Sequence, residues 1–349
     1  MTTDKEMEAL VWSGPRNMEI QTMSVPDPVP GEVLLEIDVA GICGSELSGY
    51  LGQNSLRKPP LVMGHEAAGR IVQVAGGTLA DGSQPQVGMR VTFNPLIVCG
   101  LCDRCRAGCS NLCRNRRLIG AHRPGAFARF VAVPTSQCLF LPDDLSLETG
   151  ALTEPLACSV RAVSLSQVRP GNRLFILGMG AIGLFCLAVA RALGIEQIYV
   201  SDMASSRLAI AKSWGAQEII NAGEQDVLAA IQELSPDGVD AVIDAVGSTT
   251  TRRQALLSAV PGSRVVFIGL HAADSSLDLS YLVRQEITIA GSYAYTQTDF
   301  AHAFDLLKQG LLHSSGDWVE ERPLSRGGAA FAELVDGTAM ATKIMLRPV

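Results

Sequence analysis

The chain has 349 residues, which favours two domains at about 150 residues per domain. Its 47% hydrophobic and 18% charged residues are typical of a globular protein with a sizeable core, and its net charge of −7 argues against nucleic-acid binding. The acidic, polar start MTTDKEMEAL does not resemble a signal peptide, and the apolar stretch 181–193 is shorter than the ~20 residues of a membrane span. We therefore expect a cytoplasmic protein with neither nucleic acid nor membrane as a partner.

Short apolar runs separated by glycine and proline fill residues 1 to about 150. One of them, Val33–Ile37, comes shortly after the turn residues Pro30 and Gly31. Runs of this length between turn residues are typical of short strands. This region is predicted to form a β-barrel or a sandwich.

Three separated motifs supply candidate metal ligands. They are Gly-Ile-Cys-Gly-Ser-Glu at 41–46, Gly-His-Glu-Ala-Ala-Gly at 64–69 and Thr-Glu-Pro-Leu at 153–156. A lone cysteine is usually a core residue and a lone His-Glu pair usually lies on the surface, so each motif alone is weak. Together they offer a thiolate, an imidazole and carboxylates, which zinc binds while keeping a position open for water or substrate. The polar residues that these motifs contribute are Cys43, Ser45, Glu46, His65, Glu66 and Glu154.

Five of the nine cysteines lie in one loop, namely Cys99, Cys102, Cys105, Cys109 and Cys113. Without a secretory signal, this spacing favours metal binding over disulfides. If Cys109 is the fourth ligand, the run resembles an iron–sulfur signature, although Ser110 stands where that signature has proline. If Cys113 is the fourth ligand, a closed four-thiolate zinc site of structural character results. The zinc site is favoured, with Cys109 as a spare thiol.

Strand and helix patterns alternate from about residue 155 to 290. The predicted strands are Arg173–Leu177, Gln197–Ser201, Val239–Ile243 and Arg264–Ile268, and the first predicted helix is 181–193. Such alternation predicts βαβ units and a doubly wound parallel sheet with helices on both faces. The last sixty residues return to mixed helix and strand, with a predicted amphipathic helix at Phe300–Leu307. The fold class is therefore α/β.

A glycine-rich turn joins the first of these strands to its helix, with the residues Gly178, Met179, Gly180, Ala181, Ile182 and Gly183. The first glycine allows a tight turn, the second lets the backbone approach a pyrophosphate, and the third permits close packing of helix on strand. The helix N-terminus supplies free N–H groups for the phosphates. Because the turn lies between an apolar strand and an apolar helix, it predicts a dinucleotide site.

Asp202 ends the second predicted strand. A carboxylate at this place accepts hydrogen bonds from the ribose hydroxyls and repels a 2′-phosphate. NAD is therefore favoured over NADP. Arg207 is a second candidate near the ribose, and it would weaken that preference by approaching a phosphate.

Taken together, these motifs resemble the zinc-containing medium-chain alcohol and polyol dehydrogenases over nearly the whole chain. The resemblance rests on GICGSE, GHEAAG, the cysteine loop, EPLA and GMGAIG, in that family's order and spacing. It implies a GroES-like catalytic domain, 1–153 and 291–349, around a Rossmann domain, 154–290. It also implies one catalytic and one structural zinc ion per chain, NAD as cofactor, and a homodimer or homotetramer.

The resemblance also assigns roles to individual residues. Cys43 and His65 would ligate the catalytic zinc, and Glu66 would be a third ligand or a neighbour that exchanges with water. Glu154 falls where the polyol branch has a carboxylate near the metal. Ser45 matches the hydroxyl that relays the proton of the substrate.

Glu46 stands where the family generally has aspartate, as the partner that orients the zinc-bound imidazole. Its extra methylene either shifts that imidazole or gives the carboxylate another partner. In the implied reaction zinc acts as a Lewis acid on the alcohol, and the carbon passes a hydride to the nicotinamide. The loops expected at the nicotinamide are formed by Val246, Gly247, Ile268, Gly269 and Leu270.

The substrate implied by Glu-Pro-Leu at 154–156 is a polyol or sugar alcohol, free or phosphorylated. Two positions differ from sorbitol-type relatives, since Arg161 stands where they commonly carry histidine and Ala294 where they place arginine. Tyr50 and Tyr295 are candidates for the substrate pocket or for the core. Arg161 either binds an anionic group of a substrate or pairs with an acidic side chain.

Two other functions stay open. The chain could be an enzyme of the same fold for threonine or a simple secondary alcohol, or a non-catalytic NAD-binding protein in which zinc only stabilises the fold. Self-association is expected at the sheet edge near Arg264–Leu270 and Ile287–Ser292, because both runs are apolar and rich in β-branched residues.

Overall fold

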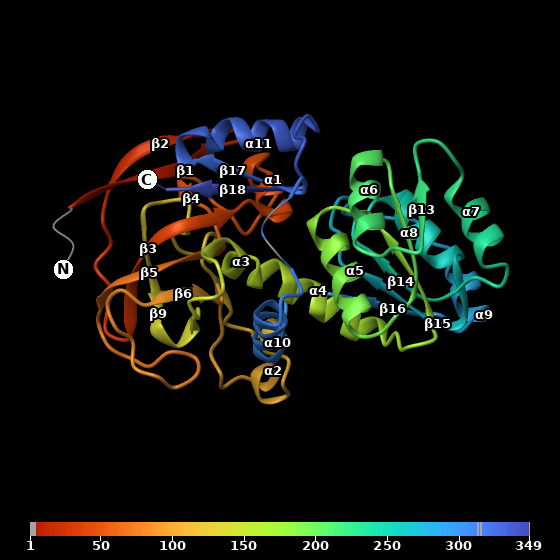
Figure 1. Cartoon of the computed structure of the whole chain (residues 1–349), viewed down its shortest axis with the longest axis horizontal. Coiled ribbons are helices and arrows are strands. Elements are labelled where there is room, and N and C mark those ends of the chain that lie inside the picture. Colours follow the sequence, from red (N-terminus) through yellow and green to blue (C-terminus); the bar gives the residue numbers. More distant parts are fainter. Residues whose placement is uncertain (1–4, 313, 315, 349) are drawn as a thin grey trace. The chain divides into compact units, whose positions relative to one another are not determined.

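The computed structural model describes residues 5–312, 314 and 316–348. The chain divides into two compact units, 1–154 with 303–349 and 155–302. Figure 1 shows the elements of each unit. The second unit thus ends at residue 302, whereas the sequence predicts a boundary at 290/291, at the end of the last strand of this unit. We keep 290/291 as a proposed domain boundary.

The first unit is built mainly from β-sheet. Within the described residues, seven strands form one mixed sheet in the order β10-β6-β5-β3-β18-β17, with β9 also paired to β3. Their bounds are β3 Glu32–Gly41, β5 Glu66–Val74, β6 Arg90–Phe93, β9 Phe130–Pro134, β10 Cys138–Phe140, β17 Val319–Pro323 and β18 Lys343–Arg347. A smaller sheet has the order β2-β1-β4, with β1 Glu6–Gly14, β2 Asn17–Ser24 and β4 Leu61–Val62. A ribbon of β7 Leu96–Ile97 and β8 Arg117–Leu118 completes the described strands of this unit.

The central strand of this unit is β3, which includes the predicted run 33–37 and continues to Gly41. It pairs with β5 along one edge and with β9 and β18 along the other. Leu34 and Leu35 are both buried, because the core covers both faces of the strand. The core also holds Phe331 of α11 (Gly327–Asp336), whose ring packs against Tyr50 and Phe127.

The second unit contains a parallel six-stranded sheet in the order β13-β12-β11-β14-β15-β16. The strands are β11 Arg173–Leu177, β12 Gln197–Asp202, β13 Glu218–Asn221, β14 Val239–Asp244, β15 Ala259–Phe267 and β16 Thr288–Gly291. The four predicted strands of this region correspond to β11, β12, β14 and β15. The parallel order confirms the predicted doubly wound sheet.

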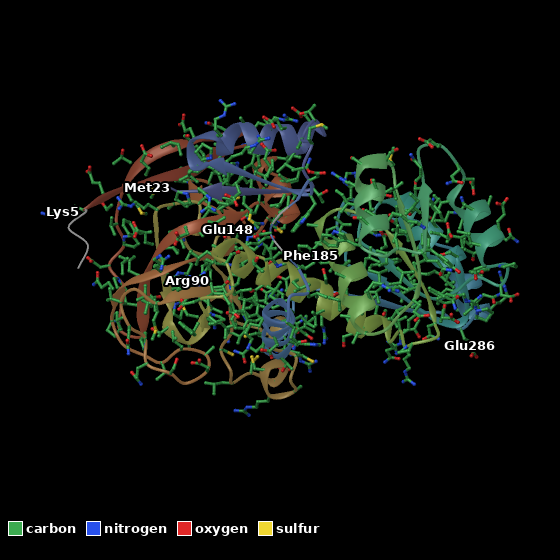
Figure 2. All side chains as sticks on the ribbon, viewed as in Figure 1. Lys5, Met23, Arg90, Glu148, Phe185 and Glu286 are labelled. Carbon is green, nitrogen blue, oxygen red and sulfur yellow. The ribbon has the colours of Figure 1, made fainter. Side chains whose placement is uncertain are left out.

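Helices cover both faces of this sheet, and Figure 1 shows α5 and α6 on one side and α7 and α9 on the other. Phe175 and Leu177 point into a core with α7 and α8, so the alternate residues of β11 face the opposite side. Phe185 of α5, labelled in Figure 2, stacks on Trp214 with ring centroids 6.4 Å apart. Both faces are therefore packed, which is why the strands are apolar throughout.

The α-helices are α1 Gly44–Tyr50, α2 Asp103–Arg106, α3 Leu147–Ala151, α4 Thr153–Ser166, α5 Ala181–Ala192, α6 Ser205–Ser213, α7 Val227–Leu234, α8 Thr249–Leu257, α9 Leu279–Arg284, α10 Gln297–Lys308 and α11. Short 3₁₀ turns lie at Ser110–Leu112, Thr135–Gln137 and Leu324–Arg326. The predicted helix 300–307 lies within α10. Its apolar residues Phe300, Ala303, Phe304 and Leu307 are buried at helical spacing. None of the described helices has the length and hydropathy to cross a membrane.

Candidate zinc centres and dinucleotide site

Cys43 comes together with His65 and Glu66 although α1 and β4 lie between them in the sequence. Cys43 precedes α1 directly after β3, and Glu66 begins β5 in register with Gly41 of β3. This pairing places the thiol beside the imidazole and carboxylate, and one ligand atom of each residue lies within 4.8 Å of the others. His65 and Glu66 are buried and Cys43 is half-buried. We refer to these three residues as the Cys43 group.

Glu46 orients the imidazole of His65. Its Oε1 lies 2.8 Å from Nδ1 of His65 and accepts a hydrogen bond from the N–H of Gly64, while Oε2 accepts from the N–H of Cys43 at 3.1 Å. The extra methylene relative to aspartate thus lets one carboxylate hold the imidazole and cap α1. With Nδ1 engaged, Nε2 is the nitrogen left for a metal ion.

Burial and charge act in opposite directions on the pKa values of His65 and Glu46. Burial lowers the pKa of His65, but the negative charges of Glu46 and Cys43 outweigh it and hold that pKa well above its usual value. Burial raises the pKa of Glu46, but His65 and the more distant charge of Arg57 lower it overall. Glu46 is therefore held as the anionic partner of the imidazole.

Lys343 joins the Cys43 group from the far end of the sequence. It begins β18, and its buried Nζ donates to the carbonyl of Ile42 at 3.0 Å and to Oε2 of Glu66. Burial lowers the pKa of Lys343, but Glu66, Cys43 and Glu154 raise it overall, so the ammonium stays charged. One oxygen of Glu66 is thus held by a cation, and Glu66 divides its charge between Lys343 and any metal ion.

Ser45 lies in the first turn of α1, beside the thiol. Its hydroxyl donates to Sγ of Cys43 at 3.4 Å. Arg57, from the loop after α1, donates from Nη1 to the carbonyl of Ser45 at 3.1 Å and from Nη2 to the hydroxyl at 3.3 Å. The predicted proton-relay residue therefore lies beside the thiol of the Cys43 group, with an arginine as its second partner.

The remaining predicted catalytic residue, Glu154, lies buried near the start of α4 and outside the Cys43 group. It is close enough to act on the charge of Lys343. Tyr50 is a core residue, because its ring packs on Phe331 and its hydroxyl donates to the carbonyl of Arg16. In the second unit, Tyr295 is buried against Phe300, and Arg161 pairs with Asp299 at 3.9 Å.

The donor set of the Cys43 group fits a zinc ion. One thiolate, one imidazole and one carboxylate are the ligand types that zinc takes in sites with an open position. The ligand atoms are close enough for one ion to reach all three, and Glu46 gives the imidazole the partner that such sites require. The arrangement can thus bind zinc with room for water or a substrate oxygen.

The cysteine loop forms a second group, made by Cys99, Cys102, Cys105 and Cys113. The Sγ–Sγ distances are 3.6 Å for 102–105, 3.9 Å for 102–113 and 3.5 Å for 99–113. A tetrahedral zinc ion with bonds of about 2.3 Å separates its sulfurs by about 3.8 Å. The four sulfurs therefore fit a single zinc ion, and we refer to residues 99–113 as the cysteine lobe.

Cys113 rather than Cys109 is the fourth member of this lobe. Sγ of Cys109 instead lies 3.8 Å from the carbonyl of Ala107. Backbone N–H groups of Arg114 and Cys105 lower the pKa of Cys102 to about 6, whereas burial and the neighbouring thiols raise the pKa of Cys105 to about 12. The iron–sulfur alternative depended on Cys109 and is not supported by this geometry.

The glycine turn of the second unit has the geometry of a dinucleotide loop. Gly178 has φ +89°, and a side chain there would meet Val246. A side chain at Gly183 would meet the carbonyl of Gly178, so this glycine is needed for the close packing of α5 on β11. Gly180 has open space beside its Cα, as a site for an approaching phosphate requires.

Asp202 lies at the end of β12 as predicted. Its Oδ2 accepts from the N–H of Met179 at 2.6 Å, and Oδ1 accepts from the N–H of Ala204 at 2.8 Å. These bonds fix the carboxylate beside the glycine turn. Arg207 lies 3.9 Å from it and is half exposed, so its guanidinium can reach the same carboxylate or solvent.

The two loops expected at the nicotinamide lie side by side after β14 and β15. A side chain at Gly247 would collide with the backbone of Gly269, and one at Gly269 with that of Val246. Asp244 fixes this arrangement, because its carboxylate accepts from the N–H groups of Val246 and Gly247, both at 2.9 Å. Leu270 follows with 80% of its surface exposed.

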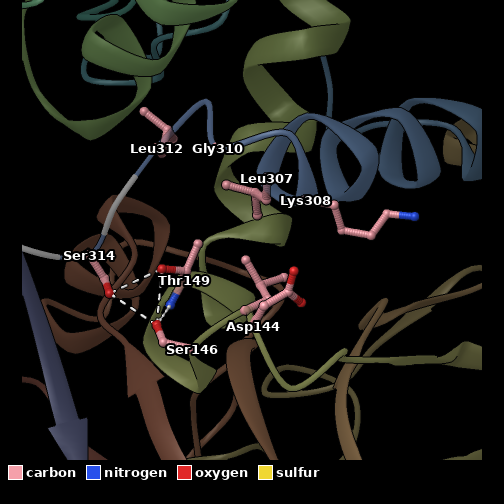
Figure 3. Close-up of a pocket in the computed structure, with 9 residues that line it drawn as sticks. Asp144, Ser146, Thr149, Leu307, Lys308, Gly310, Leu312 and Ser314 are labelled. Atoms are coloured by element: carbon pink, nitrogen blue, oxygen red, sulfur yellow. Dashed lines mark hydrogen bonds between the residues drawn. The ribbon is translucent and has the colours of Figure 1, made fainter.

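A pocket of about 340 Å³ in the first unit involves none of the predicted site residues. Figure 3 shows its lining, where the hydroxyls of Ser146, Thr149 and Ser314 bond to one another. Asp144 and Lys308 also line the pocket, but no motif or comparison links it to a ligand. We assign it no role.

Sequence reasoning missed Lys343, Arg57 and Asp244. Lys343 lies 277 residues from Glu66, so no local pattern links the two. Arg57 follows Asn54 in a polar loop and has no motif of its own. Asp244 could have been found, since an acid that ends a buried parallel strand lies at the edge where such folds bind ligands.

The comparisons with known proteins agree with this geometry. Residues 29–143 match the alcohol dehydrogenase GroES-like domain, and residues 181–309 match the zinc-binding dehydrogenase family. The sorbitol dehydrogenase of Bacillus subtilis (strain 168) is 32% identical, and the match covers 99% of this chain and 99% of that protein.

Two solved structures are similar over the whole chain. A putative zinc-binding dehydrogenase from Sinorhizobium meliloti 1021, bound to NADP, has a TM-score of 0.89 and 30% identity, covering 99% of this chain and 100% of the other. An alcohol dehydrogenase from Escherichia coli CFT073, complexed with NADH, has a TM-score of 0.90 and 25% identity, with the same coverage. The resemblance inferred from the motifs is thus confirmed, and this chain belongs to the zinc-dependent alcohol dehydrogenase family, in its polyol dehydrogenase branch.

Proposed function

We propose that this enzyme transfers a hydride from a secondary alcohol, a polyol or sugar alcohol in free or phosphorylated form, to NAD and yields a ketone. The observation that carries the proposal is the Cys43 group, in which three zinc ligand types meet beside the hydroxyl of Ser45. The likeness to a sorbitol dehydrogenase supports the substrate class.

In this proposal Cys43 and His65 hold the catalytic zinc, and Glu66 and Glu154 bind it directly or through water. Bound there, zinc supplies a Lewis acid that makes an alcohol more acidic. Ser45 accepts the proton of the alcohol and releases its own proton to solvent by turning its O–H bond away from Sγ of Cys43. The hydride goes to the nicotinamide, so that alcohol and NAD⁺ give ketone, NADH and one proton. The cysteine lobe holds the second, structural zinc.

We propose NAD rather than NADP as the working cofactor, because the fixed carboxylate of Asp202 repels a 2′-phosphate. Asp202→Gly should weaken NAD binding and improve NADP relative to NAD. The ratio of kcat/KM for the two cofactors measures this effect. An unchanged ratio would mean that Asp202 does not contact the ribose.

The main test combines elemental analysis with a substrate panel. Zinc per chain is measured, and NAD reduction is followed with polyols, sugar phosphates, threonine and butanediol. Zinc in both groups and turnover of a polyol support the proposal. Turnover of threonine or butanediol alone would replace the substrate class but keep the chemistry. One zinc per chain that persists in Cys43→Ala, with no turnover, would favour a non-catalytic protein.

A second substrate class has one observation in its favour. Arg161 pairs with Asp299, and Ala294 offers no cation, so neither residue provides the polar clamp of sorbitol-type relatives. A simple secondary alcohol or threonine needs no such clamp. The same panel separates these substrates from polyols.

We propose that the chain forms a homodimer or homotetramer through its sheet edge. At this end of the sheet the edge strand is β16 and β15 is its inner neighbour, so the predicted run 264–270 reaches that edge only through the loop after β15. Beside β16, Leu279 and Val283 of α9 are 65% and 69% exposed. Paired copies would cover this apolar surface. Light scattering during gel filtration tests it, and a monomer at micromolar protein would contradict it.

We also propose a cytoplasmic location. All nine cysteines are free, and two groups of them suit metal binding that oxidation would destroy. Fractionation of the native host, followed by immunodetection, tests this.

A further inference from the structure

Arg57 differs from two other arginines of this chain, Arg173 and Arg322, in the partners of its guanidinium. Arg173 pairs with Asp240, and Arg322 pairs with Glu320 and Glu333. Arg57 is only 4% exposed, yet both of its side-chain hydrogen bonds go to Ser45, and its Nε has no partner among the described residues. Burying a guanidinium without a bonded carboxylate is costly, so a purely structural role explains this residue poorly.

The fold makes room for Arg57 at this place. Gly49 faces it from α1, and a Cβ there would lie 2.7 Å from Cδ of Arg57. The carbonyl of Asn54 accepts the backbone N–H of Arg57 at 3.2 Å, which fixes the start of the side chain. The guanidinium is therefore held against Ser45 by its surroundings as well as by its own bonds.

The hydrogen-bonding capacity of the Ser45 hydroxyl shows what this contact does. A hydroxyl has one proton and two acceptor positions. Arg57 occupies one acceptor position, since a guanidinium only donates, and the proton of Ser45 points to Sγ of Cys43. One acceptor position remains, on an oxygen that the thiol fixes beside the candidate metal group. That position can accept the proton of an alcohol.

We propose that Arg57 is a positioning residue for the proton relay. It fixes the rotamer of Ser45 so that the free acceptor position faces the substrate hydroxyl, and its permanent charge favours the negative charge that develops on the oxygens during proton transfer. This inference rests on the proposed function, because it assigns a partner to the same hydroxyl.

The test uses the full-length holoenzyme and three variants. Arg57→Met removes the charge and the donors but keeps an apolar stem, and Arg57→Lys keeps the charge but loses the fork. Arg90→Met is the matched control, since Arg90 of β6 (Figure 2) also donates from both Nη atoms to protein groups, the carbonyls of Pro142 and Leu145, without contacting Ser45. Zinc content, NAD affinity, kcat and KM are measured for each.

Arg57→Met should lower kcat about tenfold to a hundredfold, with zinc content and NAD affinity unchanged and KM changed far less. Arg57→Lys should recover part of this loss, and Arg90→Met should leave kcat unchanged. In a Ser45→Ala background, Arg57→Met should cost little more, because the two residues act as one unit. Equal losses in both backgrounds, or a kcat of Arg57→Met within about twofold of the parent, would overturn the inference.

A crystal structure of Arg57→Met supplies a readout that needs no turnover. The hydroxyl of Ser45 should leave Cys43 for another rotamer, and an unchanged rotamer would overturn the inference. A parent enzyme with one zinc and no turnover would instead refute the proposed function. Lower zinc content in Arg57→Met would show that Arg57 only balances the charge of Glu46, and would also overturn the inference.

Discussion

The Cys43 group and the cysteine lobe would bind the same metal in very different surroundings. The lobe takes all four ligands from fifteen consecutive residues, and three of its four cysteines are only half-buried. The Cys43 group joins the end of β3 to the start of β5, and it is enclosed by Glu46, Lys343 and Arg57. A site that only has to hold a metal needs its ligands alone. A site for chemistry also needs buried charges that fix each ligand.

The largest expected effect is the loss of activity on replacing a ligand of the Cys43 group, with the zinc of the cysteine lobe retained. Cys43→Ala should lower kcat by at least about a thousandfold, because the Lewis acid is lost, while the zinc of the lobe and NAD binding remain. Elemental analysis and NAD titration check this. Cys138→Ala is the control, since Cys138 is buried in the same unit without belonging to either group. An equal loss of NAD binding in Cys43→Ala would show that the two sites are not separate.

The next prediction concerns Lys343, the buried cation that pairs with Glu66 of the Cys43 group. Lys343→Met should lower the free energy of unfolding of the zinc-free protein by about 3–5 kcal/mol, because Glu66 is left buried without its cation. Zinc should restore more stability to the variant than to the parent, since Glu66 becomes free to bind it. Urea unfolding with and without zinc measures both effects.

The control for this variant is Lys308→Met, because Lys308 is 43% exposed and its pair with Asp305 is worth less than about 1 kcal/mol. The folded-state pKa of Lys343 is raised overall, although burial alone lowers it, so its stabilisation is present at neutral pH and is lost only as strongly alkaline pH passes that pKa. A loss no larger in Lys343→Met than in Lys308→Met would contradict the role of the pair.

A third prediction tests the lobe. Cys105→Ser should remove the structural zinc and lower Tm by roughly 10 °C, because metal binding there contributes several kcal/mol to folding and each kcal/mol shifts Tm by about 2–4 °C. Cys109→Ser is the matched variant, and it should retain both zinc ions and the parent Tm. Loss of zinc from Cys109→Ser would reopen the assignment of the fourth ligand.

The smallest expected effect comes from the partner of the imidazole. Glu46→Gln should lower the zinc affinity of the Cys43 group about tenfold to a hundredfold and leave that of the lobe unchanged. Competition with a chelator, followed for each site, measures the two affinities. Glu46→Asp tests the extra methylene, because the shorter carboxylate cannot reach both His65 and the N–H of Cys43. If Glu46→Asp kept both affinities and the stability of the parent, capping by Glu46 would be unimportant.

The sequence predicted what local patterns carry. The lobe ligands, the glycine turn and Asp202 each lie within a short motif, and all of them have the expected geometry. The sequence favoured Cys113 over Cys109 as the fourth ligand, although spacing alone cannot tell which thiol turns toward the other three. Tyr50 was equally open, since an aromatic residue suits a pocket as well as a core.

Contacts between distant segments could not be predicted. Lys343 reaches Glu66 because β18 pairs with β3, and this pairing is a property of the whole sheet. The second role of Glu46 as a helix cap depends on where α1 begins, a boundary that patterns define poorly. Arg57 reaches Ser45 only because Gly49 leaves space for it.

The distance between Glu66 and Lys343 along the chain also orders the assembly of the protein during its synthesis. Ribosomes would complete the cysteine lobe as one short segment, which can take up zinc while the rest of the chain is still being made. Glu66 leaves the ribosome 277 residues before its cation. The buried pair of Glu66 and Lys343 can therefore form only after β18 has been added to the sheet.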